Sequence, residues 1–574
     1  MLRDPSSDAG RRATTDENTS RSLDMRREAA IGGGCGCATG AAHSHGHGTG
    51  LGPATRSALE KIESELRAFE VAERQRLGLE PDPAQWSDAN PQAFTAEERG
   101  GTRLLFGGLT AAHDAILEAG LRSLGYNAQA LPYADVAALQ TGKEFGNRGQ
   151  CNPTYFTVGN LVNHLVKLRD KEGVPTDDIV RNNAFLTFGA CGPCRFGTYV
   201  TEYRKALRDS GFHGFRVMAL SQEGPQDDIG GTASAIDTNL EFYIVIVKAL
   251  MAGDIINLLG YRNRPYEIEA GATDAAMQVS IEAVRAAFIE GRSILRAMKH
   301  VRKAFANVKV NRLQPKPKVA IIGEFWAMTT EGDGNYRLQR FLEEEGAECD
   351  IQIITVWALY IVWTLSYDIR ESTMLRRRKG EVDRFEGLAP RKGIFFAWLG
   401  GRAVKLVFGT FAKLAGLRGY KLPNMREIAD LAHEYYPNQL RGGEGHMEVG
   451  KVIQTAKNMK DHMIISVKPF GCMPSSGVSD GVQSLVSARF PEVEFLPIET
   501  TGDSAVNAYS RVQMALFRAR AKAHAEFEEA LKKKGLTAEE AARKAEAKAS
   551  LSQALNYPAH TVTGTAANAV YELE

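Results

Sequence analysis

The feature that most constrains this fold is an alternation of short apolar runs with segments of helical period, which occurs twice along the chain. NAFLTFG (183–189) and FRVMALS (215–221) flank one helical segment, and VAIIGEF (319–325) and MIISV (463–467) belong to a second such series. Continuous apolar runs of this length are typical of strands buried on both faces, as in parallel sheets. The chain is therefore predicted to be α/β, with two open, mostly parallel, Rossmann-like units and helical insertions.

The remaining segments complete these two units. We expect further strands at LLFGG, NAQALP, CDIQIITVW and VEFLPIE, and helices over 111–124, 155–168, 336–345 and 479–489, the first of them capped by Thr110. Residues 238–310 and 360–460 are expected to be largely helical, and 505–550 to form a long helix interrupted near Gly535.

Composition shifts divide the chain into five predicted parts. Residues 1–54 are rich in Gly, Ser, Arg and Asp and are expected to be a disordered tail. The other parts are a helical lead-in and linker (55–100), a first α/β domain (101–312), a second α/β domain with a helical insertion (313–504), and a C-terminal helical segment (505–574). The linker LQPKPK precedes the second domain.

Charge and cysteine content narrow the functional classes. The chain carries 70 basic and 69 acidic residues, which argues against a dedicated nucleic-acid-binding protein. Seven cysteines in 574 residues are too few for a disulfide scaffold. Because the first 30 residues mix Arg with Asp and Glu and contain no apolar run, no signal or transit peptide is expected, and a cytoplasmic location is predicted.

Two apolar stretches, 351–366 and 394–416, raise the question of membrane contact. The first is bracketed by acidic residues and only reaches the lower length limit of a spanning helix, and the second is interrupted by basic residues. We expect both to be core elements rather than membrane spans. Interfacial membrane contact and a dimer interface remain the alternatives.

A short tract in the tail contains metal-binding residue types. It combines a Cys-x-Cys pair with three histidines at alternating positions: Cys35, Cys37, His43, His45 and His47. Such ligands could bind zinc or copper. A flexible tail without a core to fix the ligands is the simpler interpretation.

Cysteines in glycine- and proline-rich turns are the strongest chemical signal. Cys151, Cys191, Cys194 and Cys472 all lie near the start of an expected helix, and the last three follow buried strands. Open α/β sheets bind ligands at that edge, and helix N-termini favour thiolates. A redox dithiol from the Cys191–Cys194 pair would leave the other two unused, and a Cys₄ zinc site is the other alternative. Cys349 is expected to be a buried small side chain.

The cysteine contexts resemble a known family. FGACGPCRFGTY, GKEFGNRGQCNP, GGEGHMEVG and KPFGCMPSSGV resemble the 2-hydroxyacyl-CoA dehydratase and benzoyl-CoA reductase subunits, closest to the acyl-CoA dehydratase activase-related branch, over roughly residues 104–515. The resemblance implies a 4Fe-4S cluster held by Cys151, Cys194 and Cys472, with one iron open to substrate or water. Cys191 departs from the pattern, and could be a fourth ligand, a spare thiol or a link to a second cluster.

The same resemblance implies an activity and partners. A separate ATP-dependent activase would supply one low-potential electron, which passes to the thioester carbonyl of an acyl-CoA in radical chemistry, and two such subunits would pair as a homo- or heterodimer. The chain itself lacks an ATPase signature, because GHMEVGK has Val452 where a P-loop needs Ser or Thr. An electron-relay protein without catalysis and a zinc-stabilised scaffold remain the alternatives.

Several polar residues are candidates for the chemistry. Glu444, His446 and Glu324 could transfer protons or contact substrate, each with a structural role as the alternative. Further polar residues near the expected cleft could bind anions, donate hydrogen bonds or simply form turns: Lys143, Asn147, Arg148, Arg195, Thr329, Thr330, Ser475, Ser476 and Ser479.

Overall fold

The computed structural model describes residues 53–78, 94–189, 194–221, 224–225, 236–378, 390–440, 445–548 and 551–573. The chain divides into two compact units, residues 1–89 and 90–574. The described part of the first unit is the helix α2 (Pro53–Leu77), as the apolar period predicts. The predicted disordered tail, with its Cys and His tract, and most of the linker fall outside the described residues.

Sheet 1 of the second unit has the strand order β2-β1-β3-β4-β5, and its first four strands are parallel. Its strands are β1 (Arg103–Phe106), β2 (Asn127–Ala130), β3 (Asn183–Gly189), β4 (Arg216–Ser221) and the two-residue β5 (Gly224–Pro225). The connecting helices are α3 (Ala111–Ser123), α4 (Val136–Phe145), α5 (Asn152–Asp170), α6 (Thr176–Asn182), η1 (Arg195–Thr198) and α7 (Tyr199–Asp209).

Sheet 2 repeats the arrangement with the fully parallel order β7-β6-β8-β9. Its strands are β6 (Lys318–Gly323), β7 (Glu348–Ile351), β8 (Met463–Pro469) and β9 (Glu494–Thr500). Its helices are α11 (Phe325–Thr329), η3 (Asp333–Asn335), α12 (Leu338–Glu344), α15 (Met425–His433), α16 (Gly445–Lys457), α17 (Met473–Ser475), the π-helical η4 (Ser476–Val482) and α18 (Gln483–Arg489).

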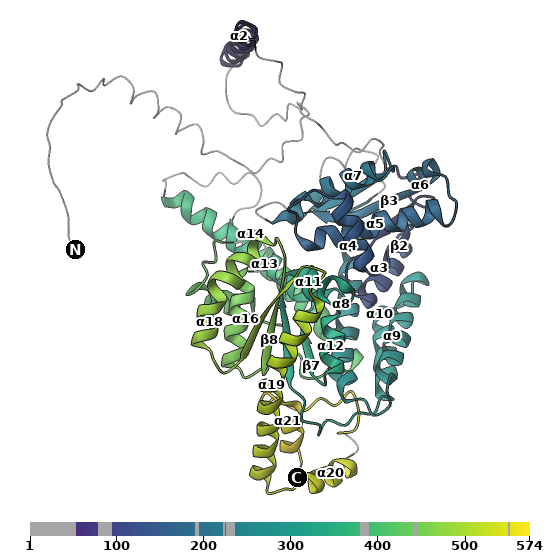
Figure 1. The fold of residues 1–574 in the computed structure, drawn as a ribbon, viewed down its shortest axis with the longest axis vertical. Coiled ribbons are helices and arrows are strands. Elements are labelled where there is room, and N and C mark those ends of the chain that lie inside the picture. The colour runs from purple at the N-terminus through teal and green to yellow at the C-terminus, as the bar shows by residue number, and fades with distance from the viewer. Residues whose placement is uncertain are drawn as a thin grey trace, which may run out of the picture. The chain divides into compact units, whose positions relative to one another are not determined.

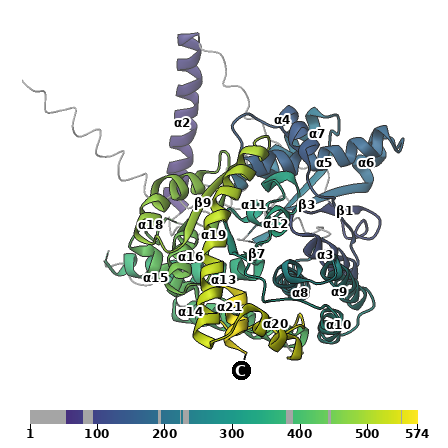
Figure 2. The same ribbon diagram turned by 60° about the horizontal axis from the view of Figure 1, so that its bottom comes forward.

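Both sheets are covered by helices on both faces (Figures 1 and 2). In sheet 1, Leu104 and Phe106 pack toward α3 and the helices α8 (Leu240–Asn263) and α9 (Ala272–Ile289), whereas Leu105 packs toward α5 and α7. In sheet 2 the side chains likewise alternate between a cluster with α12 and α19 (Ala505–Lys534) and a cluster with α15 and α16. The α/β fold class with two open parallel units is confirmed.

Additional helices surround the two sheets. They are η2 (Arg264–Tyr266), α10 (Ile294–Ala306), α13 (Ile354–Arg378), α14 (Pro390–Ala415), α19 (Ala505–Lys534), α20 (Ala538–Ala547) and α21 (Thr565–Tyr571). The predicted interruption at Gly535 is confirmed, because this residue ends α19 in the left-handed conformation with φ of 63°.

Two expectations from the apolar runs are wrong in part. CDIQIITVW was expected to be one strand, but β7 ends at Ile351 and Ile354 begins α13. An apolar run of this length cannot be divided between strand and helix by periodicity alone. The stretch 394–416 was expected to be core, yet much of it is exposed, and its buried residues, such as Ala397, Phe408, Phe411 and Ala415, lie on one side of the helix.

Candidate functional site

The strand orders place a topological switch point in each sheet, between β1 and β3 and between β6 and β8. Ligands of open α/β folds bind beyond the carboxyl ends of the strands at such points. Gly107 and Gly108 follow β1, Glu324 follows β6, and Cys472 lies three residues beyond β8. Cys194 lies five residues beyond β3, after residues 190–193, which the structure does not describe.

The carboxyl edges of the two sheets contact each other through the segment that follows β6. Glu331 accepts hydrogen bonds from the Ala111 backbone N–H (2.8 Å) and the Tyr133 hydroxyl (2.7 Å) of the sheet 1 half. Asp333 accepts one from the Val136 backbone N–H at 3.1 Å. These contacts bring the two switch points into one region of the molecule.

The three predicted ligands share one local conformation. Cys151, Cys194 and Cys472 each occupy the N-cap position of a helix, α5, η1 and α17 respectively, with extended backbone and no capping hydrogen bond from the side chain. Serine, threonine, asparagine and aspartate are the residues that normally stabilise this position. Three cysteines in their place leave three sulfur atoms at helix starts, where the helix dipole favours negative charge.

Two of the turns that carry these cysteines contact each other. The Asn152 backbone N–H donates to the Phe470 carbonyl at 3.0 Å, which joins the Cys151 turn to the Cys472 turn. Gly471 is so close that a side chain there would lie 3.0 Å from the Gln150 carbonyl oxygen and 3.2 Å from the Cys151 Cα. Gln150 and Gly471, which are 321 positions apart in the sequence, are therefore neighbours.

The helix α7, which follows the Cys194 turn in the chain, contacts the Cys151 turn. Glu202 of α7 accepts hydrogen bonds from the backbone and side chain of Asn147 and from the side chain of Gln150, at 2.7–3.0 Å. The Tyr199 hydroxyl, at the start of α7, is 3.1 Å from the Cys151 sulfur. Asn147, a candidate anion ligand from the sequence, thus forms a structural contact with Glu202.

Cys151 has the best defined surroundings of the three. It is 7% exposed, and its sulfur is 3.2 Å from the Thr154 hydroxyl in addition to the contact with Tyr199. Burial raises the pKa of the Cys151 thiol, the hydroxyls of Thr154 and Tyr199 lower it, and the nearby negative charge of Glu324 raises it further. Without a cation beside it, this sulfur is a neutral thiol.

Glu324 lies near Cys151 and is partly buried. It caps α11, where its side chain accepts a hydrogen bond from the Ala327 backbone N–H at 2.8 Å. Burial raises the pKa of Glu324 above its usual value against the opposing effect of the Ala327 and Trp326 backbone N–H groups. A carboxyl group with a raised pKa is suited to hold a proton and pass it to a neighbouring group.

A small cavity of about 20 Å³ lies between the two switch points. Its lining joins both halves of the unit: Gly107, Gly108, Asp114, Tyr133, Thr157, Asn160, Tyr203, Trp326 and Thr330, with five further residues of the sheet 1 half. Thr157 and Asn160 belong to α5, which Cys151 begins. At 1.5 Å per residue, Thr157 stands about 9 Å along the helix from Cys151.

Asp114 is the functional candidate that sequence reasoning missed. It lines the cavity, accepts the backbone N–H groups of Gly108 (3.3 Å) and Leu109 (3.4 Å), and is 6% exposed. Burial raises its pKa to about 7. The sequence signal was the Gly-Gly pair directly after a buried strand, followed by an acidic residue in the first turn of the next helix.

The other polar residues that the sequence suggests for the site lie elsewhere or form structural contacts, except Thr330. His446 is buried against Tyr360 and Trp363, with ring centroids 5.2 and 4.9 Å apart. Ser476 donates to the Cys472 carbonyl at 2.9 Å, which is a helix contact. Thr330 lines the cavity, whereas Thr329 donates to the Phe325 carbonyl. Glu444 and Cys191, and the side chain of Ser479, lie outside the described residues.

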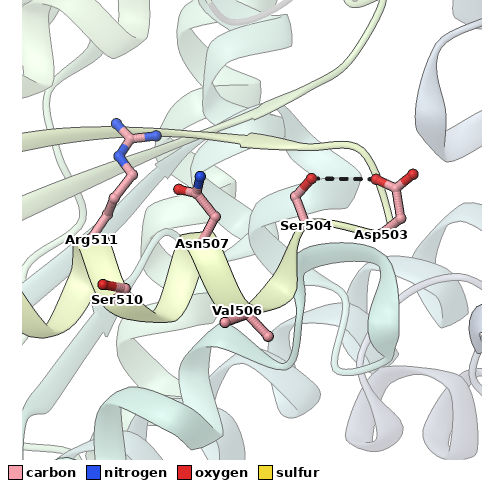
Figure 3. Close-up of a pocket in the computed structure, with 6 residues that line it drawn as sticks. All are labelled: Asp503, Ser504, Val506, Asn507, Ser510 and Arg511. Atoms are coloured by element: carbon pink, nitrogen blue, oxygen red, sulfur yellow. Dashed lines mark hydrogen bonds between the residues drawn. The ribbon is translucent and has the colours of Figure 1, made fainter.

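A larger concavity of about 520 Å³ lies on the outer surface at the start of α19. Figure 3 shows its six lining residues, which all come from the first turns of α19 and the residues just before it. Ser504 donates to Asp503, and Arg511 donates to the Pro497 carbonyl at 2.7 Å. Because one helix surface forms the whole lining, this concavity has no convergent polar groups.

The described cysteines are not joined by disulfides. Among the described residues, no group of three His, Cys, Asp or Glu side chains is placed to hold a metal ion. Cys349, by contrast with the three turn cysteines, lies buried in β7, as the sequence predicts.

Comparisons with known proteins add no further evidence for a family. No protein-family model matches the chain, and a search of the curated proteins found no match. The fold and the geometry of the candidate site therefore carry the functional argument.

Proposed function

We propose that this chain is an iron-sulfur protein of the 2-hydroxyacyl-CoA dehydratase and benzoyl-CoA reductase type. A 4Fe-4S cluster held by Cys151, Cys194 and Cys472 would serve low-potential electron transfer to a substrate of the acyl-CoA class, with a separate ATP-dependent activase as electron donor. The observation that carries the proposal is that three cysteines occupy helix N-cap positions, that the Cys151 and Cys472 turns contact each other, and that α7, which follows the Cys194 turn, contacts the Cys151 turn.

The residues present fit such a group. Thiolates are the ligands that iron-sulfur clusters prefer, and a cluster is larger than a single ion, so its ligands stand farther apart. The hydroxyls of Thr154 and Tyr199 are placed to donate hydrogen bonds to the Cys151 sulfur, a kind of contact that tunes cluster potential. When bound, the cluster would supply one-electron chemistry at low potential.

The protein's own groups have two further tasks in this proposal. Glu324 would hold a proton in a partly buried position close to Cys151 and release it to an oxygen atom of the substrate. Trp326, Thr157 and Asn160 would position the substrate in the cavity, whose Thr157 stands about 9 Å along α5 from Cys151, and would exclude water from it.

The size of the cavity favours the electron-relay alternative. Pockets for small molecules hold about 300–1,000 Å³, and the space at the switch points holds about 20 Å³. A protein that only passes electrons needs no substrate pocket. A catalytic protein needs the segment 324–335 to move away from the sheet 1 half before an acyl-CoA can enter.

Anaerobic purification of the full chain tests the cluster. Cys151→Ala, Cys194→Ala and Cys472→Ala should each lose most of the iron that the wild-type protein retains, because two thiolates hold a cluster poorly. Cys349→Ala is the matched control, since it also removes a buried thiol, and should keep its iron. Full iron content in any of the three turn variants would refute that ligand assignment.

A second measurement separates catalysis from relay. With the cluster reduced, addition of an acyl-CoA should change its electron paramagnetic resonance spectrum if substrate reaches an open iron. An unchanged spectrum at saturating acyl-CoA would favour the relay protein over the enzyme.

A further inference from the structure

The helices α13 and α14 form a hairpin whose base is buried and whose tip is exposed. A side chain at Gly393 would lie 2.9 Å from Ile369, and one at Gly401 would lie 3.6 Å from Val362, so the two helices run antiparallel. Val356, Phe408 and Phe411 anchor the base in the core cluster beneath α8 and α10. In Figure 1 the first turns of α14 extend away from sheet 2.

The exposed part of α14 is unusually apolar. Two helices in the described part of the chain are long and apolar enough to span a bilayer by length and composition, Leu240–Tyr266 and Arg391–Ala415. The first is 61% buried in its apolar window, as expected of a core helix, whereas the second is 17% buried. The exposed side chains near the hairpin tip are large: Phe395 (55%), Phe396 (55%), Trp398 (57%), Leu399 (47%) and Leu406 (71%).

These side chains lie on one face. At 100° per residue, Phe395, Leu399 and Leu406 fall within about 40° of one another, and Trp398 stands about 60° from Phe395. The buried residues of α14, such as Phe408 and Phe411, point to the opposite side. Arg402 and Lys413 also fall within about 20° of Phe395, so the exposed face of the helix combines large apolar side chains with cations.

The charged side chains of α14 itself are all positive. Arg391, Lys392, Arg402, Lys405 and Lys413 are exposed, and α14 contains no Asp or Glu. Aromatic and aliphatic side chains flanked by cations are typical of helices that lie in the headgroup region of anionic membranes.

We propose that the α13–α14 tip binds the surface of membranes that contain anionic lipids, with α14 lying in the plane of the interface. The exposed apolar side chains of α14 enter the headgroup boundary, and the five cations of α14 contact lipid phosphates. Because the second half of α14 is fixed in the core, the helix does not cross the bilayer in this fold. A second copy of the chain fits this face less well, since a twofold interface would oppose two sets of five cations.

Vesicle flotation with the full chain tests the proposal. The protein should float with vesicles of phosphatidylcholine and 30% phosphatidylserine, and much less with phosphatidylcholine alone or in 0.5 M salt. Phe395→Ser combined with Trp398→Ser should lower the bound fraction at least tenfold, and Arg391→Glu combined with Lys392→Glu should lower it at least fivefold. Phe517→Ser, which removes an aromatic side chain that is 73% exposed on α19, is the control and should bind as wild type.

Three results would overturn the proposal. The first is equal binding of the double variants and the wild type. The second is binding to vesicles that does not depend on their content of phosphatidylserine. The third is a dimer in solution that the Phe395 and Trp398 substitutions convert to monomer without any effect on flotation, since the face would then be an interface between copies.

Discussion

At the scale of single residues, two carboxyl groups with raised pKa values lie in the region between the two sheets. Asp114 and Glu324 each follow the carboxyl end of a central strand, and each has a raised pKa; Asp114 is buried and Glu324 is partly buried. Their carboxyl groups accept hydrogen bonds from backbone N–H groups, which keep them oriented. Such groups cost stability when ionised, so their retention at a ligand-binding edge is consistent with a role in proton transfer.

Asp114→Asn should change how stability depends on pH. Because burial raises the pKa of Asp114 to about 7 from 3.8, the folded state binds this proton more tightly than the unfolded chain. The resulting stabilisation is fully present below about pH 4 and is lost as pH rises through about 7. The wild-type protein should therefore lose on the order of 2 kcal/mol relative to Asp114→Asn between pH 5 and pH 8.

Urea unfolding of both proteins at pH 5 and pH 8 measures this difference. Parallel pH profiles would show that Asp114 is ionised throughout this range and would remove it from the candidate proton donors.

At the scale of elements, the close packing of α4 on α5 fixes the start of the helix that carries Cys151. A side chain at Gly142 would lie 1.8 Å from the Tyr155 carbonyl oxygen, and one at Gly159 would lie 1.8 Å from the Ala138 carbonyl oxygen. The two glycines therefore let the backbones of the helices approach each other. No other residue fits either position without moving α5.

Gly159→Ala should destabilise the protein by about 1–3 kcal/mol, because the added methyl group forces α4 and α5 apart. Gly409→Ala, on α14 with nothing within 4 Å of the added atom, should instead be neutral or stabilise by up to about 1 kcal/mol. Denaturant midpoints of the two variants measure both effects. Equal stability of the two would contradict the close approach of α4 and α5.

The sequence predicts elements well where one period dominates. The VAIIG and MIISV runs are strands β6 and β8, and Thr110 caps α3 with its side chain, as expected. It fails where an apolar run serves two elements, as at Ile351–Ile354, or where an apolar face meets no partner in the chain, as at Phe395 and Trp398. The apolar composition of a segment indicates that its side chains prefer to leave water. It does not indicate which surface will cover them.

At the scale of the whole second unit, the central contact joins the two cysteine turns across the sheets. The sequence places Cys151 and Cys472 each at a helix start, which the structure confirms, but their proximity depends on how one α/β half packs on the other. Local patterns contain no information on that packing. The contact itself rests on Gly471, whose φ of 78° and lack of a side chain bring it onto Gln150 and Cys151.

Gly471→Ala should therefore lower iron retention severalfold, because the added atom pushes the Cys472 turn away from the Cys151 turn. Gly346→Ala is the matched control: its φ of 80° imposes the same backbone strain, but nothing lies within 4 Å of the new atom. Iron content per folded chain compares the two. Equal iron in both variants would mean that the contact between the turns does not shape the metal site.

Metal analysis with electron paramagnetic resonance on the anaerobically purified wild-type chain tests the central claim most directly. The account predicts about four irons per chain and, after reduction, the signal of a single 4Fe-4S cluster. A protein that contains zinc or no metal, and shows no such signal after anaerobic reconstitution with iron and sulfide, would contradict it.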